Sequence, residues 1–407
     1  MDRRGNIRCL RVCIVNDLSS ERAQSLGVHP FSRHLRYARF DLHLSGTTSM
    51  KEQPSSYLTR LAFPLLNMLA CMMLGTLTGI YVGAPLAGLI WGTFAGLAAG
   101  IIFEWAFSRH AAFYRWRIYA CIALEIPLVF FVIGPYAFIL SQTKPDPHPI
   151  CCETPLDYGA AGYETLHIET GNGITLAGWY VPPEKTPNTV IILLHGAGGD
   201  RRGTAWHARQ LIGAGYGVFL YDQRALGEST GTMTTLGWKD GSDLLAVTEF
   251  LAQRPEVDAE RIGVVGLSLG GHIALNAAHL DPGRFAALWL DGVQAQQISD
   301  YPAAENVGED FATFLQTIIL KMAETRIGQK PPPPFIEILP AISDTPTMIV
   351  IAGQDDFERR VYERYIGVAG ASVEFWLIEN AQHNGGPALD PDGYRRRMLK
   401  FFQDALT

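Results

Sequence analysis

The chain has 407 residues, of which 48% are hydrophobic and only 18% are charged, and its formal net charge is −7. An average soluble domain carries about 25% charged residues, so this composition argues against a disordered or wholly soluble protein. The charge is unevenly spread: it is +4 in residues 1–50, +2 in residues 51–150 and −13 in residues 151–407. Nucleic acid is not expected as a partner, because phosphate binding needs a basic surface.

All six cysteines lie before residue 153, and none has the spacing of zinc ligands. The C-terminal 255 residues therefore contain no disulfide and no thiol nucleophile. Covalent catalysis in that part would need an oxygen nucleophile, and we expect neither a metal nor a cofactor.

Residues 1–49 show no hydrophobic period and contain eight arginines without a lysine. We expect this segment to be disordered or to precede the true start of the protein at Met50.

Three apolar runs follow, and we predict them to be transmembrane helices at about 61–82, 86–107 and 118–140. One helix through the first two runs would extend about 70 Å, more than twice the bilayer core of about 30 Å, so the Gly-Ala-Pro break at 83–85 divides them. Arginines follow the second run, and the positive-inside rule then places the N-terminus in the cytoplasm and the chain after residue 140 outside it. The alternative is a set of buried core helices. The arginines between the second and third runs are Arg109, Arg115 and Arg117.

Residues 141–157 are rich in proline and are predicted to be a linker, after which strands alternate with helical runs. This alternation predicts an α/β fold with a mostly parallel eight-stranded sheet flanked by helices, over residues 158–407. The first two strands flank a Gly-Asn-Gly turn at 171–173 and are expected to form an antiparallel hairpin. The expected strands are ETLHIET, ITLAGWYV, TVIILLH, GVFLYD, RIGVVG, FAALWLD, TMIVIAG and VEFWLIE.

The chemistry begins at the motif GLSLG, residues 266–270, which lies between a β-run and a helical run. Its glycines permit a sharp strand-to-helix turn that exposes the hydroxyl of Ser268 as a nucleophile. A second glycine-rich motif, HGAGG at 195–199, follows a neighbouring strand. We predict that the main-chain amides of Ala197 and Leu269 form an oxyanion hole. We expect His195 to order this loop rather than to act as a base.

A serine hydroxyl is a weak nucleophile without a base and an acid. Open α/β sheets place such groups at the carboxyl ends of strands, in the chain order Ser, Asp/Glu, His. His383 is the only histidine after His279 and is the predicted base. Asp355 and Asp356 both follow the strand TMIVIAG. We favour Asp356 as the acid, with Asp355 capping a helix or facing solvent.

These stretches resemble the α/β-hydrolase superfamily over residues of about 160–407, and in particular the serine-hydrolase branch that includes Bem46-like and serine-aminopeptidase-like proteins. In that family the acid commonly ends a G-x-x-D stretch after its strand. The resemblance places the glycine of that stretch at Gly353, the acid at Asp356 and the histidine at His383. Two positions depart from the pattern: Ala225 replaces a usual glycine, and Phe357 replaces a proline after the acid. The matching stretches are HGAGGDRRG, YDQRALGESTG, RIGVVGLSLGGHIAL, IAGQDDFERR and NAQHN.

About fifty residues, 295–345, separate the strands FAALWLD and TMIVIAG, and they include an amphipathic helix at about 311–326. We interpret them as a small cap over the site; simple packing on the domain, or contact with a membrane surface, are the alternatives. The resulting hypothesis is a membrane-anchored serine hydrolase that cleaves carboxylic esters of small or amphiphilic molecules. A peptidase or amidase with the same residues, and a non-catalytic hydrolase-like binding module, remain alternatives.

Overall fold

The computed structural model describes residues 64–65, 67–76, 85–107, 116, 119, 123, 126–171, 173–184 and 188–406. The chain divides into two units, Met1–Gln53 and Pro54–Thr407, and the described residues all belong to the second. The prediction for residues 1–49 falls outside the described residues, as do parts of the predicted spans 61–82 and 118–140, whereas the span 86–107 is described in full.

Glycines allow the first described helices to approach each other closely. Residues 67–76 are helical, and α2 runs from Pro85 to Phe107. A Cβ atom on Gly92 would come within 2.1 Å of the Cys71 oxygen, and one on Gly96 within 2.4 Å of the Asn67 oxygen, so glycine is required at both positions. Further along the chain, a π-helical turn, η1 (Val129–Ile133), continues into α4 (Gly134–Gln142). In the described part of the chain, no helix is both long enough and apolar enough to cross a membrane.

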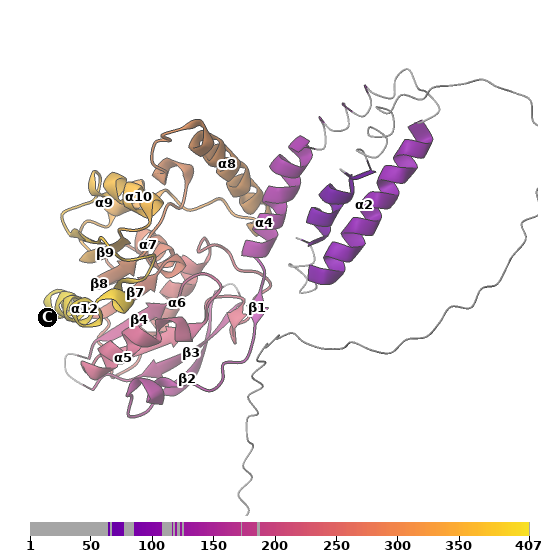
Figure 1. Cartoon of the computed structure of the whole chain (residues 1–407). Helices are drawn as coiled ribbons and strands as arrows, with labels where there is room; N and C mark the ends of the chain where they lie inside the picture. Colours follow the sequence, from indigo (N-terminus) through magenta and orange to yellow (C-terminus); the bar gives the residue numbers. More distant parts are fainter. Residues whose placement is uncertain are drawn as a thin grey trace, which may run out of the picture. The chain divides into compact units, whose positions relative to one another are not determined.

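The C-terminal part of the chain is built on a sheet of eight strands in the order β10-β9-β8-β7-β4-β5-β3-β2 (Figure 1). The pairs β2–β3 and β3–β5 are antiparallel and all other neighbours are parallel. The predicted mostly parallel eight-stranded sheet and its N-terminal hairpin are thus confirmed. The strands are β2 (Glu164–Glu169), β3 (Thr175–Val181), β4 (Val190–Leu194), β5 (Gly217–Tyr221), β7 (Ile262–Leu267), β8 (Ala287–Asp291), β9 (Thr347–Ala352) and β10 (Val373–Ile378).

Helices cover both faces of this sheet, which explains the continuous apolar runs of its central strands. In β4, Val190, Ile192 and Leu194 belong to one core cluster, while Ile191 and Leu193 belong to the other. The first cluster receives α6 (Asp240–Ala252), α7 (Leu269–Leu280), α9 (Phe335–Ala341) and α10 (Asp356–Ile366), and the second receives α5 (Ala205–Gly213) and α12 (Pro391–Leu406). A one-residue shift along such a strand would exchange the two faces, so its register is fixed by packing.

The predicted cap is a helical insertion between β8 and β9. It contains a short turn, η4 (Ile298–Asp300), then α8 (Val307–Ile327) and α9. Asn306 caps α8 by accepting a hydrogen bond from the Glu309 amide, and Gly328 ends it in a left-handed conformation.

The predicted linker at 141–157 differs from expectation, because part of it is built into the fold. Asp146–Pro147 form β1, which pairs in parallel with β6 (Leu226–Gly227), and Pro155–Tyr158 form a 3-10 turn, η2. Four prolines in this segment favour extended backbone, and the segment uses that conformation to pair with the chain near the sheet.

Candidate active site

Ser268 lies in the sharp turn between β7 and α7. Its φ of 51° and ψ of −113° are strained for a residue that carries a side chain. The turn depends on the two glycines of the motif: a Cβ atom on Gly266 would come within 2.6 Å of the Gly270 backbone, and one on Gly270 within 2.4 Å of the Leu194 oxygen. The strain is offset by a 2.7 Å hydrogen bond from the Ser268 amide to the Asp291 oxygen. The sequence motif therefore forms the sharp strand-to-helix turn that it predicted.

His383, in the loop after β10, reaches the serine. Its Nε2 lies 3.0 Å from the Ser268 Oγ, and its Nδ1 lies 2.7 Å from the Glu358 Oε2. The imidazole is thereby oriented with one nitrogen toward the hydroxyl and the other toward a carboxylate. This is the arrangement in which a histidine can accept a proton from serine.

Glu358 is held rigidly at the start of α10. Its side chain is fully buried, and its second carboxylate oxygen accepts a 2.8 Å hydrogen bond from the Ala352 amide at the end of β9. The hydrogen bond that the His383 Nδ1 donates to Glu358 raises the pKa of this histidine above its usual value, and this outweighs the opposing effect of partial burial. The carboxylate thus stabilises a protonated imidazole.

The expected acid, Asp356, is not the residue that the structure brings to His383. Its side chain is 68% exposed and pairs with Arg359 on the outer face of α10. Asp355 caps that helix by accepting a hydrogen bond from the Glu358 amide, which confirms the helix cap as one of the two alternatives expected for it. The cap fixes where α10 begins, so that position 358, and not 356, faces the end of the sheet. The choice of Asp356 is corrected to Glu358 on this geometry.

The two predicted oxyanion donors, Ala197 and Leu269, line the same cavity as Ser268. Neither amide donates to another group within the described part of the chain. Leu269 is the first residue of α7, where main-chain amides have no partner inside the helix. The two amides are therefore available to a ligand beside the serine.

The loop that carries Ala197 is ordered by buried polar contacts. The His195 Nε2 accepts a hydrogen bond from the Gln223 amide, and burial lowers the pKa of this histidine, so it stays neutral. Arg201, with a fully buried side chain, pairs with Asp222 at 2.5 Å and with Glu228 at 2.8 Å. His195 and Arg201 thus hold the loop at 195–201 against the segment at 222–228. Sequence reasoning missed Arg201, which lies six residues after His195 in a stretch that it used only for the resemblance.

A cavity of about 570 Å³ opens in front of Ser268. Its wall combines apolar groups such as Leu236 and Leu269 with amide side chains such as Gln294 and Gln296. The cap contributes Gln316 and Leu320 from α8. The cavity also contains His272, whose pKa burial lowers to about 4, so this side chain is neutral at physiological pH. A mixed wall of this kind suits a molecule with both apolar and polar parts.

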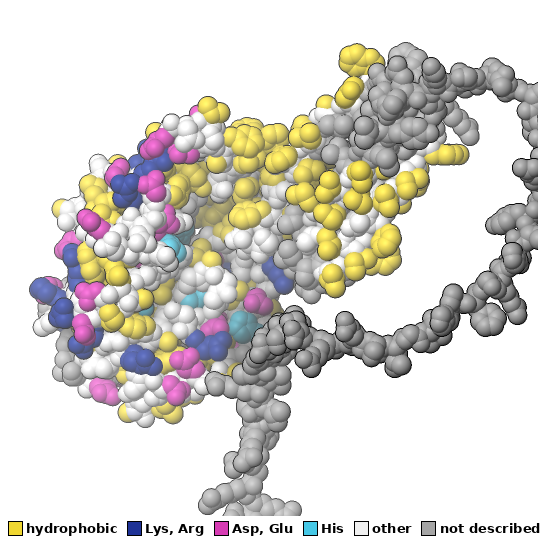
Figure 2. Space-filling view, viewed as in Figure 1, with side chains coloured by type: hydrophobic (Ala, Val, Ile, Leu, Met, Phe, Trp, Pro, Cys, Tyr) yellow, Lys and Arg dark blue, Asp and Glu magenta, His cyan; other side chains and the backbone are white. Residues whose placement is uncertain are grey.

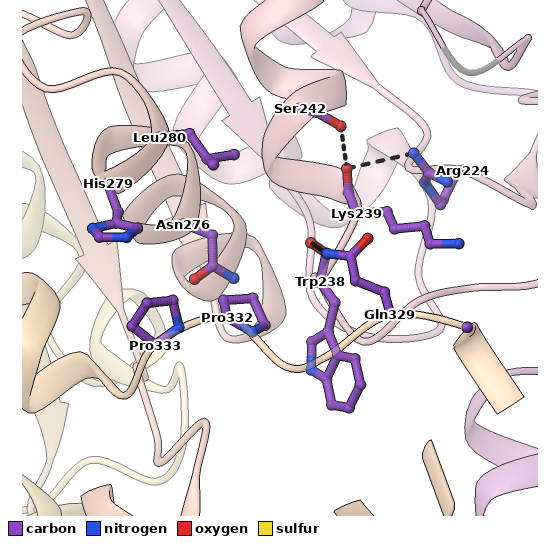
Figure 3. Close-up of a pocket in the computed structure, with 11 residues that line it drawn as sticks. Arg224, Trp238, Lys239, Ser242, Asn276, His279, Leu280, Gln329, Pro332 and Pro333 are labelled. Carbon is purple, nitrogen blue, oxygen red and sulfur yellow. Dashed lines mark hydrogen bonds between the residues drawn. The ribbon is translucent and has the colours of Figure 1, made fainter. Parts of the chain in front are cut away.

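A second cavity, of about 750 Å³, lies beside the first, and Trp238 lines both. It does not contain Ser268 or His383. Figure 3 shows Arg224 and Ser242 donating to the main-chain oxygen of Lys239 at its edge. On the side of the first cavity, Asn276 from this lining bonds Gln296 at 2.8 Å. The two cavities therefore share Trp238, and the hydrogen bond between Asn276 and Gln296 joins their linings.

Asp355, Glu358 and His383 offer potential metal-ligand atoms that lie within 4.8 Å of one another. Their atoms are already engaged, however, since Glu358 accepts bonds on both oxygens and Asp355 accepts one from the Glu358 amide. The cluster is explained by the contacts that orient His383.

Together, the doubly covered parallel sheet, the strained serine after a central strand and the histidine after the last strand define a hydrolase of the α/β class. The sequence profile of the Alpha/beta hydrolase family matches residues 191–397, which is half of the chain. The protein therefore belongs to the alpha/beta hydrolase family.

The chain is also similar to other proteins and to solved structures. The chain is 28% identical over 225 residues to the uncharacterized protein Rv2307c of Mycobacterium tuberculosis, covering 55% of this chain and 73% of that protein. It is 25% identical over 260 residues to the uncharacterized protein YqkD of Bacillus subtilis, covering 58% and 78%. Among solved structures, the Pyrococcus furiosus esterase Pf2001 is similar, with a TM-score of 0.50 and 22% identity, over 64% of this chain and 100% of that one. At this identity the likeness shows a shared fold.

Proposed function

We propose that this protein is a serine hydrolase that cleaves carboxylic esters, within the branch suggested by the sequence resemblance. The observation that carries the proposal is the hydrogen-bonded chain from the Ser268 hydroxyl through His383 to the buried carboxylate of Glu358. The amides of Ala197 and Leu269 border the same cavity and support the proposal.

In the proposed reaction, the Ser268 Oγ attacks the ester carbonyl carbon while the His383 Nε2 accepts the hydroxyl proton. Glu358 stays ionised and stabilises the imidazolium that forms. The amides of Ala197 and Leu269 donate to the oxyanion of the tetrahedral intermediate, which collapses as His383 passes its proton to the leaving alcohol. Water, activated by the same histidine, then attacks the acyl-enzyme and releases the carboxylic acid.

An ester is the less demanding substrate for this arrangement, because an alcohol is a better leaving group than an amine. Alcohol departure from an ester needs one proton transfer, which His383 supplies. The neutral His272 and the glutamine side chains of the wall can orient a substrate through hydrogen bonds without providing an ionised acid or base.

The test is covalent labelling of the folded full chain with a fluorophosphonate probe, followed by turnover of matched p-nitrophenyl esters and p-nitroanilides. We expect labelling of the wild type, none of Ser268→Ala, and hydrolysis of esters in preference to anilides. Preference for anilides would replace the esterase with an amidase or peptidase. A folded wild type that is neither labelled nor active would favour a non-catalytic binding module.

We also propose, from the sequence, that the N-terminal region anchors the protein in a membrane with the hydrolase domain on the extracytoplasmic side. The support is the set of apolar runs at 61–82, 86–107 and 118–140 and the arginines between the last two. Extraction of membranes with alkaline carbonate should leave the protein in the pellet. A reporter fused after Thr407 should be active only outside the cytoplasm. Release of the protein by carbonate would refute the membrane anchor, and reporter activity in the cytoplasm would refute the extracytoplasmic placement.

A further inference from the structure

The cavity in front of Ser268 has a wall that the matched family region does not supply. Four lining residues, Ser141, Gln142, Lys144 and Asp146, lie well before residue 191, where the family match begins. They belong to the end of α4 and to the segment that follows it. A substrate that reaches Ser268 therefore meets side chains from a part of the chain that the sequence assigned to a linker.

This wall is fixed in place from several sides. The Thr234 hydroxyl donates a 2.7 Å hydrogen bond to the Gln142 oxygen. Ile139, only 1% exposed, packs in one cluster with Trp238. Beyond it, Asp146 pairs with Leu226 in the β1–β6 ladder. The segment is thus positioned by a hydrogen bond, an apolar contact and a strand pairing.

The wall and the cap form one unit. Phe131 of η1 meets the rings of Phe311 and Phe314 on α8 edge to face, with centroid separations of 6.1 and 5.8 Å. Figure 2 shows hydrophobic side chains gathered where α8 and α4 adjoin. Because α8 also places Gln316 and Leu320 in the cavity, the two helices define its outer side together.

Lys144 is the positive charge that this cavity presents. Its side chain is half-buried, and no carboxylate lies within ion-pair distance of it in the described part of the chain. Asp146 is 65% exposed and is turned toward His148, whose Nδ1 is 3.9 Å away. The one other basic side chain among the described lining residues is His272, which is neutral.

We propose that Lys144 is a substrate-binding residue that selects esters carrying a negatively charged group, such as a carboxylate, on the part that occupies the cavity. This inference rests on the proposed esterase function and specifies its substrate class. An ammonium group that is partly removed from water and lacks a protein anion attracts an anion more strongly than a fully solvated one. The fixed wall holds this charge at a set place relative to Ser268.

The test compares two substrates on the full chain: p-nitrophenyl hydrogen adipate, which carries a free carboxylate, and p-nitrophenyl methyl adipate, in which that charge is capped. The quantity is the ratio of kcat/KM for the anionic ester to that for the neutral one. For Lys144→Met we expect this ratio to fall about fivefold, the effect of losing one partly exposed charge pair. Lys144→Arg should keep most of the preference. Lys321→Met is the matched control, because that lysine is 74% exposed on α8 and pairs with Glu324.

The outcomes separate the two claims. If Lys144→Met hydrolyses both esters with the wild-type ratio, Lys144 does not select the substrate, although the esterase function stands. If the wild type turns over neither ester and its serine is not labelled, the proposed function fails and the inference fails with it. A preference that weakens as salt is raised from low to physiological ionic strength would support the charge as its cause.

Discussion

Replacing Glu358 by glutamine tests which acid orients the histidine. The substitution keeps the shape of the side chain and an oxygen that can accept the Ala352 amide, but it removes the negative charge 2.7 Å from the His383 Nδ1. It therefore separates the electrostatic role of this residue from its role in packing.

The expected loss of kcat follows from the contact between Glu358 and His383. With charge centres about 4 Å apart and an effective dielectric constant of about 20, a carboxylate stabilises an imidazolium by about 4 kcal/mol. Because the His383 side chain is 34% exposed, solvent reduces this value. Removing the charge should therefore lower kcat by about 10²-fold, less than the roughly 10⁴-fold seen when an amide replaces the acid of a well-studied serine protease triad.

The assay is steady-state hydrolysis of a p-nitrophenyl ester by the wild type, Glu358→Gln and the matched control Asp356→Asn. Asp356 lies two residues away on the exposed face of the same helix, so its variant should stay within about twofold of the wild type. Urea unfolding of each variant controls for lost structure. Loss of activity in Asp356→Asn together with near-normal activity in Glu358→Gln would refute the assignment made from the geometry.

Three further outcomes are expected. The neighbouring carboxylate raises the pKa of His383 and catalysis needs the neutral imidazole, so kcat/KM should rise with pH through an apparent pKa above the ordinary histidine value. Glu358→Gln should move this rise to lower pH, and a rise at the wild-type pH would show that the carboxylate does not cause the raised pKa. Gly270→Ala places a Cβ 2.4 Å from the Leu194 oxygen and should cost about 3 kcal/mol in urea unfolding, whereas Gly213→Ala at an open helix end should change little; equal costs would show that the elbow can relax. Arg201→Met leaves the buried Asp222 without its cation and should cost about 3–5 kcal/mol; a stable variant would mean that the two loops do not depend on this pair.

The fold was predictable because its signals are local. Each strand is a continuous or alternating apolar run, and the helices predicted at about 86–107 and 311–326 lie within a few residues of the bounds of α2 and α8. The contacts of Ser268 and His383 were predictable for the same reason, since each directly follows a strand. These positions depend on the periodicity of the sheet and on the rule that open α/β sheets place functional groups at the carboxyl ends of their strands.

Glu358 was missed because its position is set by a helix, not by the strand. Counting residues from the end of β9 favours Asp356, but the Asp355 cap starts α10 at residue 356. From there, position 358 lies on the same face as the buried Val361 and Tyr365. The spacing of these apolar residues was present in the sequence and, applied with the cap, would have pointed the glutamate inward.

The role of residues 141–146 was missed for a different reason. Proline-rich composition reports the absence of helix propensity, and it carries no information on which distant segment an extended chain will meet. The pairing of Asp146 with Leu226 joins positions eighty residues apart, and the contact of Gln142 with Thr234 spans a similar separation. Such pairings are determined by the tertiary fold.

The path of His383 to Ser268 crosses the end of β8, because the serine follows β7, the histidine follows β10, and β8 and β9 lie between them. Gly292, the residue directly after β8, makes this path possible. A Cβ atom at this position would come within 2.6 Å of the His383 Cε1, and its φ is +75°. The absence of a side chain at one position thus determines whether base and nucleophile can meet.

Gly292→Ala should therefore displace the imidazole and lower kcat by at least about 10²-fold, the scale of a displacement of about 1 Å in a catalytic group. Gly283→Ala is the matched control, because its φ is +85° and a Cβ there meets nothing within 4 Å. Both substitutions force alanine into a left-handed conformation at about 1–2 kcal/mol, so urea unfolding of Gly283→Ala measures the cost of the backbone conformation alone. Only Gly292→Ala should lose ester hydrolysis and fluorophosphonate labelling. If the two variants are equally active, the histidine reaches the serine by a route that does not need the space above Gly292, and the geometry assigned to the site is incorrect.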